Sequence, residues 1–407
     1  MNTTAERFLR YAKMHTTSKE DTGLCPSSDE QFALAKLLVR ELIDMGIQNA
    51  EVDEHCYVYA SLPASEGLAH LPALGFVAHM DTAPAFSGLD VQPIVHENYN
   101  GGDIILPKNG RVISAAQFPF LQTLKGKSVI TADGSTLLGA DDKAGIAEIL
   151  SLCEAIIQNN IPHCKLCIGF TPDEEVGAGA DLFDVKRFGA AFAYTMDGDA
   201  VGGIEYENFN AASVRVHIKG VSVHPGSAKD IMVNALSLAA ELHAMLPAEQ
   251  TPQHTEGYEG FYHLESLCGT AAEAEMEYIL RDHSRALFEE KKDTLACMVE
   301  MLQHKYPTAS IRMDTEDSYF NMKEQIAPHM HLVENAKRAA EAVGVTPVVK
   351  PIRGGTDGAR LSYMGLPCPN LGTGGANFHG PYELIAAEDM AKAVQMLQNL
   401  VALYSKA

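Results

Sequence analysis

Five short segments of the chain each place carboxylates or a histidine at the end of an apolar run. They read LGFVAHMDT (74–82), LLGADDKAG (137–145), GFTPDEEVG (169–177), AYTMDGD (193–199) and GANFHGPYE (375–383). Two histidines with three carboxylates form a donor set that suits Zn²⁺ and suits copper or iron–sulfur chemistry less well. The segments therefore predict a pair of metal ions that activates water for hydrolysis.

His79 and Asp81 stand two residues apart at the end of the first segment. In extended backbone their side chains point the same way, so one can bind a metal while the other holds the second imidazole nitrogen. Taken alone, such a pair is more often a surface histidine beside a salt-bridge partner. The metal-site interpretation therefore depends on the other four segments.

Asp141 and Asp142 open a helical pattern in the second segment. Aspartate in the first turn of a helix commonly caps it, and this is the interpretation we favour for Asp142. Asp141 follows a Gly-Ala turn and could instead direct its two oxygens at two cations. A bridging carboxylate of this kind holds metals about 3.5–4 Å apart.

Glu174 and Glu175 are adjacent, so in an extended loop they point in different directions. One can bind metal while its neighbour takes a proton from the metal-held water. Asp197 at a third strand end and His379 in a glycine-rich loop complete the set. Each of these residues is a weak signal alone, and their convergence carries the prediction.

The elements that must position these residues follow an α/β pattern with a largely parallel central sheet flanked by helices. The runs Leu74–Ala78, Leu166–Phe170 and Ala191–Met196 are typical of strands buried on both faces, and Gln31–Met45 has helical spacing. Open α/β sheets bind ligands beyond the carboxyl ends of their strands. Each of the three strand-like runs delivers its candidate ligands at that end.

Residues 209–322 follow a different pattern, with strands and helices in a β-α-β-β-α-β-like order that is typical of a ferredoxin-like α+β domain. The chain has 407 residues, more than the roughly 250–300 at which one hydrophobic core stops growing. We therefore predict a catalytic domain formed by residues 1–208 and 323–407, with residues 209–322 inserted as a smaller lid or dimerisation domain.

Composition limits the partners. The chain has 53 acidic and 31 basic residues and a formal charge of −22, which argues against a nucleic-acid partner because such binding depends on clustered Lys and Arg. No apolar segment approaches the roughly 20 residues that span a bilayer, and the N-terminus lacks a secretory apolar region. The eight scattered cysteines fit a reducing compartment, so we expect a cytoplasmic protein with small substrates.

The motifs HMDT, GADDKAG, FTPDEEVG, MDGD and NFHGPYE resemble those of the co-catalytic di-zinc metallopeptidase and aminoacylase family. Together they resemble its peptidase T branch, the tripeptide aminopeptidases, and the resemblance covers essentially the whole chain. It implies two Zn²⁺ per subunit. His79 and Asp197 would bind one ion, Glu175 and His379 the other, with Asp141 bridging.

The resemblance also implies that Glu174 is the general base, that Asp81 positions His79, and that the peptide bond after Asp141 is cis. It implies a lid domain, through which a homodimer is possible. His224 in VSVHPGS would stabilise the oxyanion that develops on the scissile carbonyl. The alternative is a structural role, which is more common for a lone loop histidine.

Arg281 and Arg353 are candidates for holding the peptide carboxylate, because arginine binds carboxylates bidentately. Their alternative role is a structural ion pair, and the glycine-rich surroundings slightly favour Arg353 for ligand binding. The long gap between the first two motifs suggests an insertion beside the site. We expect one of residues 98–100, such as Asn100, to contact the substrate amino end.

We expect an exopeptidase that releases the N-terminal residue from tripeptides. Hydrolysis of dipeptides, carboxypeptidase substrates or N-acyl amino acids by the same centre stays open. A non-catalytic peptide-binding module is a further alternative, but a pure binder has no use for both Glu174 and Glu175. A nucleotide-dependent enzyme is excluded, because GADDKAG lacks the G-x-x-x-x-G-K-[ST] spacing that cradles phosphate.

Overall fold

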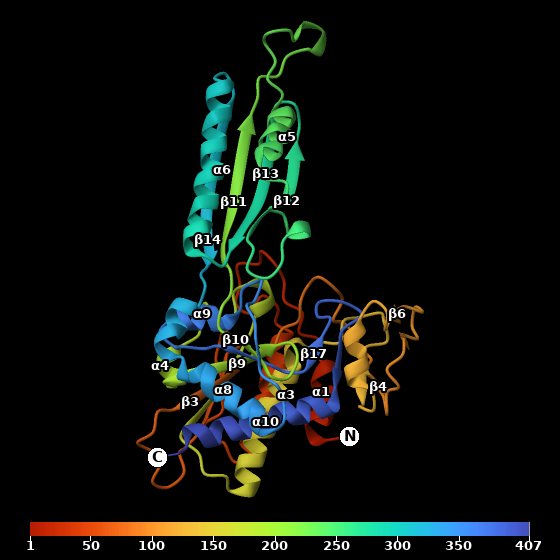
Figure 1. Cartoon of the computed structure of the whole chain (residues 1–407), viewed down its shortest axis with the longest axis vertical. Coiled ribbons are helices and arrows are strands. Elements are labelled where there is room, and N and C mark those ends of the chain that lie inside the picture. The colour runs from red at the N-terminus through yellow and green to blue at the C-terminus, as the bar shows by residue number, and fades with distance from the viewer. Residues whose placement is uncertain (407) are drawn as a thin grey trace. The chain divides into compact units, whose positions relative to one another are not determined.

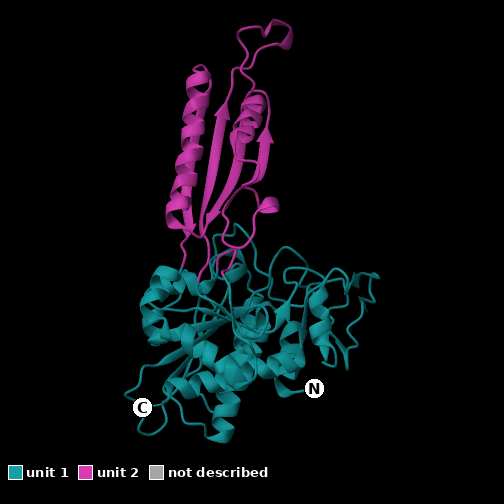
Figure 2. Cartoon of the chain, viewed as in Figure 1, with its two compact units in different colours: residues 1–206, 322–350, 356–407 teal, residues 207–321, 351–355 magenta. Residues whose placement is uncertain are grey.

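The computed structural model describes residues 1–406, which form two compact units (Figure 2). Unit 1 contains residues 1–206, 322–350 and the described residues from 356 onward, and unit 2 contains residues 207–321 and 351–355. The inserted segment therefore runs from 207 to 321, where the sequence suggested 209 to 322. The assignment of residues 351–355 to unit 2 differs from the sequence-based prediction, which left them in the catalytic domain.

Unit 1 is built on an eight-stranded sheet in the order β1-β2-β8-β3-β9-β16-β10-β15 (Figure 1). The four strands β8, β3, β9 and β16 run parallel. On either side of them, β2 and β10 run antiparallel to this group, while β1 pairs antiparallel with β2 and β15 pairs parallel with β10. The bounds are Glu51–Val52 (β1), Val58–Leu62 (β2), Leu74–His79 (β3), Leu166–Thr171 (β8), Phe192–Gly198 (β9), Gly203–Glu205 (β10), Val348–Val349 (β15) and Asn370–Gly372 (β16). The predicted α/β class is confirmed.

Helices flank this sheet, with bounds Thr3–Ala12 (α1), Gln31–Asp44 (α2), Ala140–Asn159 (α3), Val185–Phe188 (α4), Lys323–Ile326 (α7), His331–Ala342 (α8), Asp357–Tyr363 (α9) and Ala387–Tyr404 (α10). Helix α3 contacts β3 and β9 as well as α1 and α10, so it is buried on almost every side (Figure 1). None of the helices within residues 1–406 combines the length and the apolar character needed to cross a bilayer.

Helix α3 carries a buried acid, Glu148, which is 0% exposed. Neither of its carboxylate oxygens has a hydrogen-bond partner among residues 1–406. Burial raises the pKa of Glu148 well above its usual range, so the folded chain keeps the acid neutral where the unfolded chain ionises it. Stability is therefore lost as the pH rises above the unfolded pKa, by up to about 1.4 kcal/mol per pH unit.

We expect Glu148→Gln to match the wild type in acid and to become progressively more stable than it as the pH rises, because the glutamine cannot ionise. Urea unfolding between about pH 5 and pH 8 measures the difference in the free energy of unfolding. A difference that stays constant across this range would mean that Glu148 does not titrate on unfolding.

The segment between β3 and α3 forms a hairpin, β5-β6, and contributes β4 and β7 to a small sheet in the order β17-β18-β7-β4. The bounds are Ile94–His96 (β4), Ile104–Ile105 (β5), Val112–Ile113 (β6), Val129–Thr131 (β7), Gly375–Ala376 (β17) and Leu384–Ala386 (β18). Strands β17 and β18 come from the C-terminal part of the chain, and the loop between them carries His379. This loop is therefore anchored at both ends.

Unit 2 is a four-stranded antiparallel sheet in the order β12-β13-β11-β14 with two helices. The bounds are Asn210–Lys219 (β11), Ala235–Met245 (α5), Phe261–Gly269 (β12), Glu273–Asp282 (β13), Arg285–Lys305 (α6) and Ser310–Tyr319 (β14). This β-α-β-β-α-β order is the one that the sequence predicted. Alternate residues of β13 are buried, as expected for a sheet that is covered on one face.

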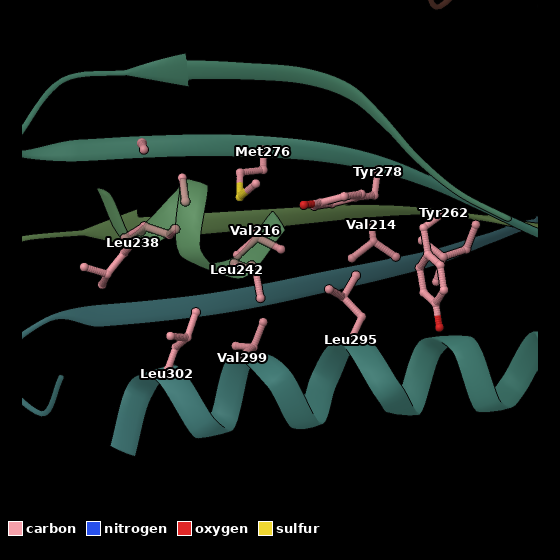
Figure 3. Packing of buried hydrophobic residues seen from close by; sticks show 14 of the residues in the cluster. Val214, Val216, Leu238, Leu242, Tyr262, Met276, Tyr278, Leu295, Val299 and Leu302 are labelled. Atoms are coloured by element: carbon pink, nitrogen blue, oxygen red, sulfur yellow. The ribbon is translucent and has the colours of Figure 1, made fainter. Parts of the chain in front are cut away.

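The core of unit 2 forms between this sheet and its helices (Figure 3). Val214 and Met276 on the sheet lie in the same buried cluster as Leu295 and Leu302 of α6. The core follows from the period-2 pattern of the strands and the apolar stripe of α6. Unit 2 thus has a hydrophobic core of its own.

Candidate metal centre

The five predicted metal ligands converge on one point in unit 1. His79 ends β3, Asp141 lies at the start of α3, Glu175 follows β8, Asp197 lies near the end of β9, and His379 lies between β17 and β18. They form two groups that share Asp141. In each group, the atoms that could bind a metal all lie within 4.8 Å of one another: His79, Asp141 and Asp197 form one group, and Asp141, Glu175 and His379 form the other.

Asp141 faces one histidine with each of its oxygens. Its Oδ1 is 2.9 Å from Nε2 of His79, and its Oδ2 is 3.1 Å from Nε2 of His379. Nε2 of His79 is 3.6 Å from Oδ1 of Asp197, and Nε2 of His379 is 3.0 Å from Oε2 of Glu175. Asp141 is therefore a carboxylate between two groups of candidate metal ligands. The peptide bond after Asp141 is cis, as the family resemblance implied.

Asp81 is completely buried and has two tasks. Nδ1 of His79 lies 3.2 Å from the backbone oxygen of Asp81 and 3.4 Å from its carboxylate, in line with the expected orienting role. The same carboxylate accepts hydrogen bonds from the backbone N–H groups of Glu174 (3.0 Å) and Glu175 (3.1 Å). Asp81 therefore ties the histidine strand to the glutamate loop, a link that the sequence did not reveal.

Asp142 is also buried, and it serves the backbone. Its Oδ1 accepts the N–H of Gly145 and its Oδ2 accepts the N–H of His79. The first contact is the helix-capping role that we favoured for Asp142, and the second connects α3 to β3. The two neighbouring aspartates thus have different contacts: Asp141 faces the two histidines, and Asp142 accepts backbone N–H groups.

The candidate centre brings three carboxylates close together, so it needs positive charge to balance them. Burial lowers the pKa of His79, but hydrogen bonds to Asp141, Asp197 and Asp81 outweigh it and raise that pKa well above its usual range. Hydrogen bonds to Asp141 and Glu175 raise the pKa of His379 to about 10. Without metal, the imidazoles therefore hold protons between the carboxylates. Bound divalent ions would replace this positive charge, and the donor set fits Zn²⁺.

Glu174 is the neighbour of the candidate ligand Glu175 in sequence but belongs to neither candidate ligand group. No hydrogen bond from residues 1–406 reaches its carboxylate, although its backbone is held by Asp81. Burial, reinforced by the charge of Asp197, raises the pKa of Glu174 well above its usual range. A carboxylate with a raised pKa and no fixed partner is suited to exchanging protons near neutral pH.

Comparison with known proteins identifies the family. Residues 206–310 match the family model of a peptidase dimerisation domain. The whole chain is 53% identical to a protein named Peptidase T from Alkaliphilus oremlandii, with 100% of each chain covered. The chain belongs to the peptidase T family. The relationship that the five motifs predicted is confirmed.

Solved structures match the fold. Aminopeptidase PepT from Bacillus cereus gives a TM-score of 0.79 at 23% identity, covering 99% of this chain and 98% of that one. A Bacillus subtilis protein described as a dinuclear metal binding peptidase gives a TM-score of 0.66 at 16% identity, covering 98% of this chain and 97% of that one. At these identities, the likeness concerns the fold alone.

Two residues that the sequence did not predict, Thr356 and Asp173, form hydrogen bonds next to the candidate ligands of this peptidase T family member. Thr356 donates its hydroxyl hydrogen to Oδ2 of Asp197 at 3.2 Å. Asp173, directly before the glutamate pair, is buried and accepts hydrogen bonds from Ser27 and Gln31. Thr356 lies in the glycine-rich GGTDG stretch, which was the only signal for it. For Asp173 the sequence held no such signal, because its partners Ser27 and Gln31 are distant from it in the chain.

Asn100 and its neighbour make contacts within their own loop. Oδ1 of Asn100 accepts the N–H of Gly102 at 2.8 Å, and the side chain is exposed. Tyr99 is buried in a local hydrophobic cluster and donates its hydroxyl hydrogen to the backbone oxygen of Gly102. These contacts explain both residues as parts of a turn. The structure does not join Asn100 to either ligand group.

Arg353 forms hydrogen bonds within unit 2. Its guanidinium donates to the backbone oxygens of Thr255, Gly257 and Glu259, and it lies 5.0 Å from the centroid of the Phe209 ring. These contacts explain why residues 351–355 belong to unit 2. They also favour the structural alternative for Arg353, because most of its donors are occupied.

Arg281 and His224 keep free donors within the described chain. Nη1 of Arg281 donates to the backbone oxygen of Arg353, whereas its Nε has no hydrogen-bond partner among residues 1–406. Nδ1 of His224 accepts the N–H of Gly226 at 3.1 Å, so the neutral imidazole carries its proton on Nε2. His224 is exposed and thus presents a hydrogen-bond donor at the surface of unit 2.

Proposed function

We propose that this chain is a metal-dependent aminopeptidase that releases the N-terminal residue from tripeptides. The observation that carries the proposal is the pair of candidate ligand groups that share Asp141. Glu174 is adjacent to Glu175 of one group, and its carboxylate has no hydrogen-bond partner within residues 1–406. Membership of the peptidase T family supports the same reaction. The cytoplasm is the proposed location, in keeping with eight cysteines that are all free thiols.

In the proposed centre His79 and Asp197 would hold one Zn²⁺, Glu175 and His379 would hold the other, and Asp141 would serve both. Bound ions would polarise the scissile carbonyl and lower the pKa of a coordinated water. The description of the Bacillus subtilis structural neighbour as a dinuclear metal binding peptidase agrees with this stoichiometry. The chemistry of the donors favours zinc.

Glu174 acts as general base and then as general acid. Its carboxylate takes a proton from the attacking water and returns it to the amine of the leaving dipeptide. Asp81 holds the backbone of Glu174 and Glu175 together, which keeps the base next to the ligand. The raised pKa of Glu174 suits both directions of proton transfer near neutral pH.

His224 donates its Nε2 hydrogen to the developing oxyanion in this proposal, from the same subunit or from a partner. We expect His224→Ala to lower kcat for a tripeptide by about 10²–10³-fold with a smaller change in KM, because the contact strengthens in the transition state. Steady-state kinetics measure both constants. An unchanged kcat would assign His224 a purely structural role.

Arg281 is the proposed contact for the peptide carboxylate, now ahead of Arg353, whose donors are engaged elsewhere. Asn100 stays a weaker candidate for the amino end.

A peptide panel tests the reaction. We expect cleavage of tripeptides with a free amino end, and little cleavage of N-blocked tripeptides, dipeptides or tetrapeptides. Preferred hydrolysis of N-acyl amino acids or release of the C-terminal residue would instead support the related hydrolases. Binding of tripeptides without turnover by zinc-loaded protein would support a peptide-binding module.

We also propose a homodimer formed through unit 2. The match of residues 206–310 to a peptidase dimerisation domain supports this assembly. Size-exclusion chromatography with light scattering is expected to give twice the mass of one chain at micromolar concentration. A mass of one chain under the same conditions would contradict the dimer.

A further inference from the structure

A buried carboxylate from the C-terminal segment, that of Glu383, contacts the turn that carries Asp141. Glu383 directly precedes β18 and is 1% exposed. Its Oε2 accepts the backbone N–H groups of Leu138 (2.7 Å) and Gly139 (2.8 Å), and its Oε1 accepts the N–H of Asp141 (3.1 Å). Three main-chain donors from one turn therefore converge on one buried carboxylate.

This turn is the part of the chain that presents Asp141. Gly139 adopts a left-handed conformation with φ +78°, and Asp141 itself has φ −83° and ψ 105°, outside the helical region. The N–H groups before and at the start of a helix have no acceptor within the helix, and here those of Leu138, Gly139 and Asp141 are accepted by Glu383. Three hydrogen bonds to one buried side chain restrain three successive parts of the turn at once, so Glu383 is well suited to fixing its conformation.

Glu383 is itself held by the small sheet. The residue after it, Leu384, pairs with Thr131 of β7, and Ile385 pairs with Ile130. The same β17–β18 loop carries His379, whose Nε2 lies 3.1 Å from Oδ2 of Asp141. One loop thus supplies both a ligand and the support of the bridging ligand.

We propose that Glu383 is a positioning residue that fixes the Asp141 turn, so that the Asp141 carboxylate faces both metal positions before any metal binds. The inference rests on the proposed metal centre and extends it to a residue that touches no metal. A glutamine at this position would turn an amide NH₂ toward at least one of the backbone N–H groups, so at least one of the three hydrogen bonds would be lost.

Metal titration of the metal-free protein tests the proposal. We expect Glu383→Gln to weaken the binding of both ions by about 10–100-fold, because Asp141 serves both positions and supporting hydrogen bonds of metal ligands have effects of this size. Zn²⁺ affinity is measured against a competing chelator, and Co²⁺ absorption reports the ligand geometry. The Co²⁺ spectrum should change with the loss of affinity.

Glu388→Gln is the matched control. Glu388 is an exposed carboxylate that also accepts a backbone N–H, from Ser128 at 2.8 Å, and it has no hydrogen bond to the ligand groups. The control should keep the affinity and the spectrum of the wild type. If Glu383→Gln does not fold, as judged by circular dichroism, Glu383→Asp takes its place. It keeps the carboxyl group but withdraws the oxygens from the turn, so it is expected to weaken the binding of both ions as well.

The outcomes are distinct. A folded Glu383 variant that binds both ions with the affinity and spectrum of the wild type overturns the positioning role, even if its thermal stability is reduced. Weakening of only one ion also overturns it, because the role acts through the shared ligand. A wild-type protein that fails to bind two ions would instead refute the proposed metal centre.

Discussion

Replacing Glu174 by glutamine is expected to abolish peptide hydrolysis while both metal ions stay bound. The variant keeps the shape of the side chain and the backbone hydrogen bond to Asp81, but it cannot accept a proton. General acid–base catalysis by a side chain typically contributes 10²–10⁴-fold, so kcat should fall by about that factor or more. Tripeptide hydrolysis and metal analysis of the same preparation provide the measurement.

Glu175→Gln is the matched control for this result, because it changes the neighbouring residue in the same way. Glu175 belongs to the second ligand group, so this variant should lose affinity for one ion. Turnover by Glu174→Gln at the level of the wild type would remove Glu174 from the role of base. Loss of metal from Glu174→Gln would instead make it a ligand.

Replacing Asp141 by asparagine should have the broadest effect on the centre. Asp141 directs Oδ1 to one histidine and Oδ2 to the other, and an asparagine offers a single oxygen and no negative charge. We expect the variant to hold at most one ion per chain after gel filtration and to lose at least about 10³-fold in kcat, because both ions depend on the shared carboxylate. Atomic emission measures the metal content.

His379→Ala separates the two positions. It removes one member of the second group and leaves His79, Asp141 and Asp197 intact, so one ion should be retained. Loss of both ions from His379→Ala would mean that the two ions bind cooperatively. Retention of two ions by Asp141→Asn would contradict the bridging role.

The convergence of the candidate ligands was predictable because each of them lies where a recognisable local pattern ends. His79 and Asp197 lie at the ends of buried strands, and parallel strands bring their carboxyl ends to one edge of the sheet. Asp141 was distinguished from Asp142 by the turn before it. The order of elements in unit 2 was predictable for a similar reason, since its strands and helices have clear periodicities.

The supporting contacts were not predictable from local patterns. Glu383 acts on backbone N–H groups that lie more than 240 residues earlier, and a backbone donor leaves no trace in the sequence. Asp81 was expected to serve His79, whereas its contacts to the glutamate loop depend on the packing of β3 against β8.

Arg353 shows a different limit. Its glycine-rich surroundings suggested a ligand-binding loop, but residues 351–355 carry no periodicity that would assign them to either unit. Their membership of unit 2 depends on long-range hydrogen bonds, such as the one from the N–H of Ile352 to the backbone oxygen of Glu207.

Anomalous diffraction from crystals of the zinc-loaded protein tests the shared-ligand centre most directly. We expect two zinc peaks about 3.5–4 Å apart, each about 2.0–2.2 Å from a different oxygen of Asp141. His79 and Asp197 should complete one coordination sphere, and Glu175 and His379 the other. A single peak, or two peaks of which either lacks Asp141 as a ligand, would contradict the account.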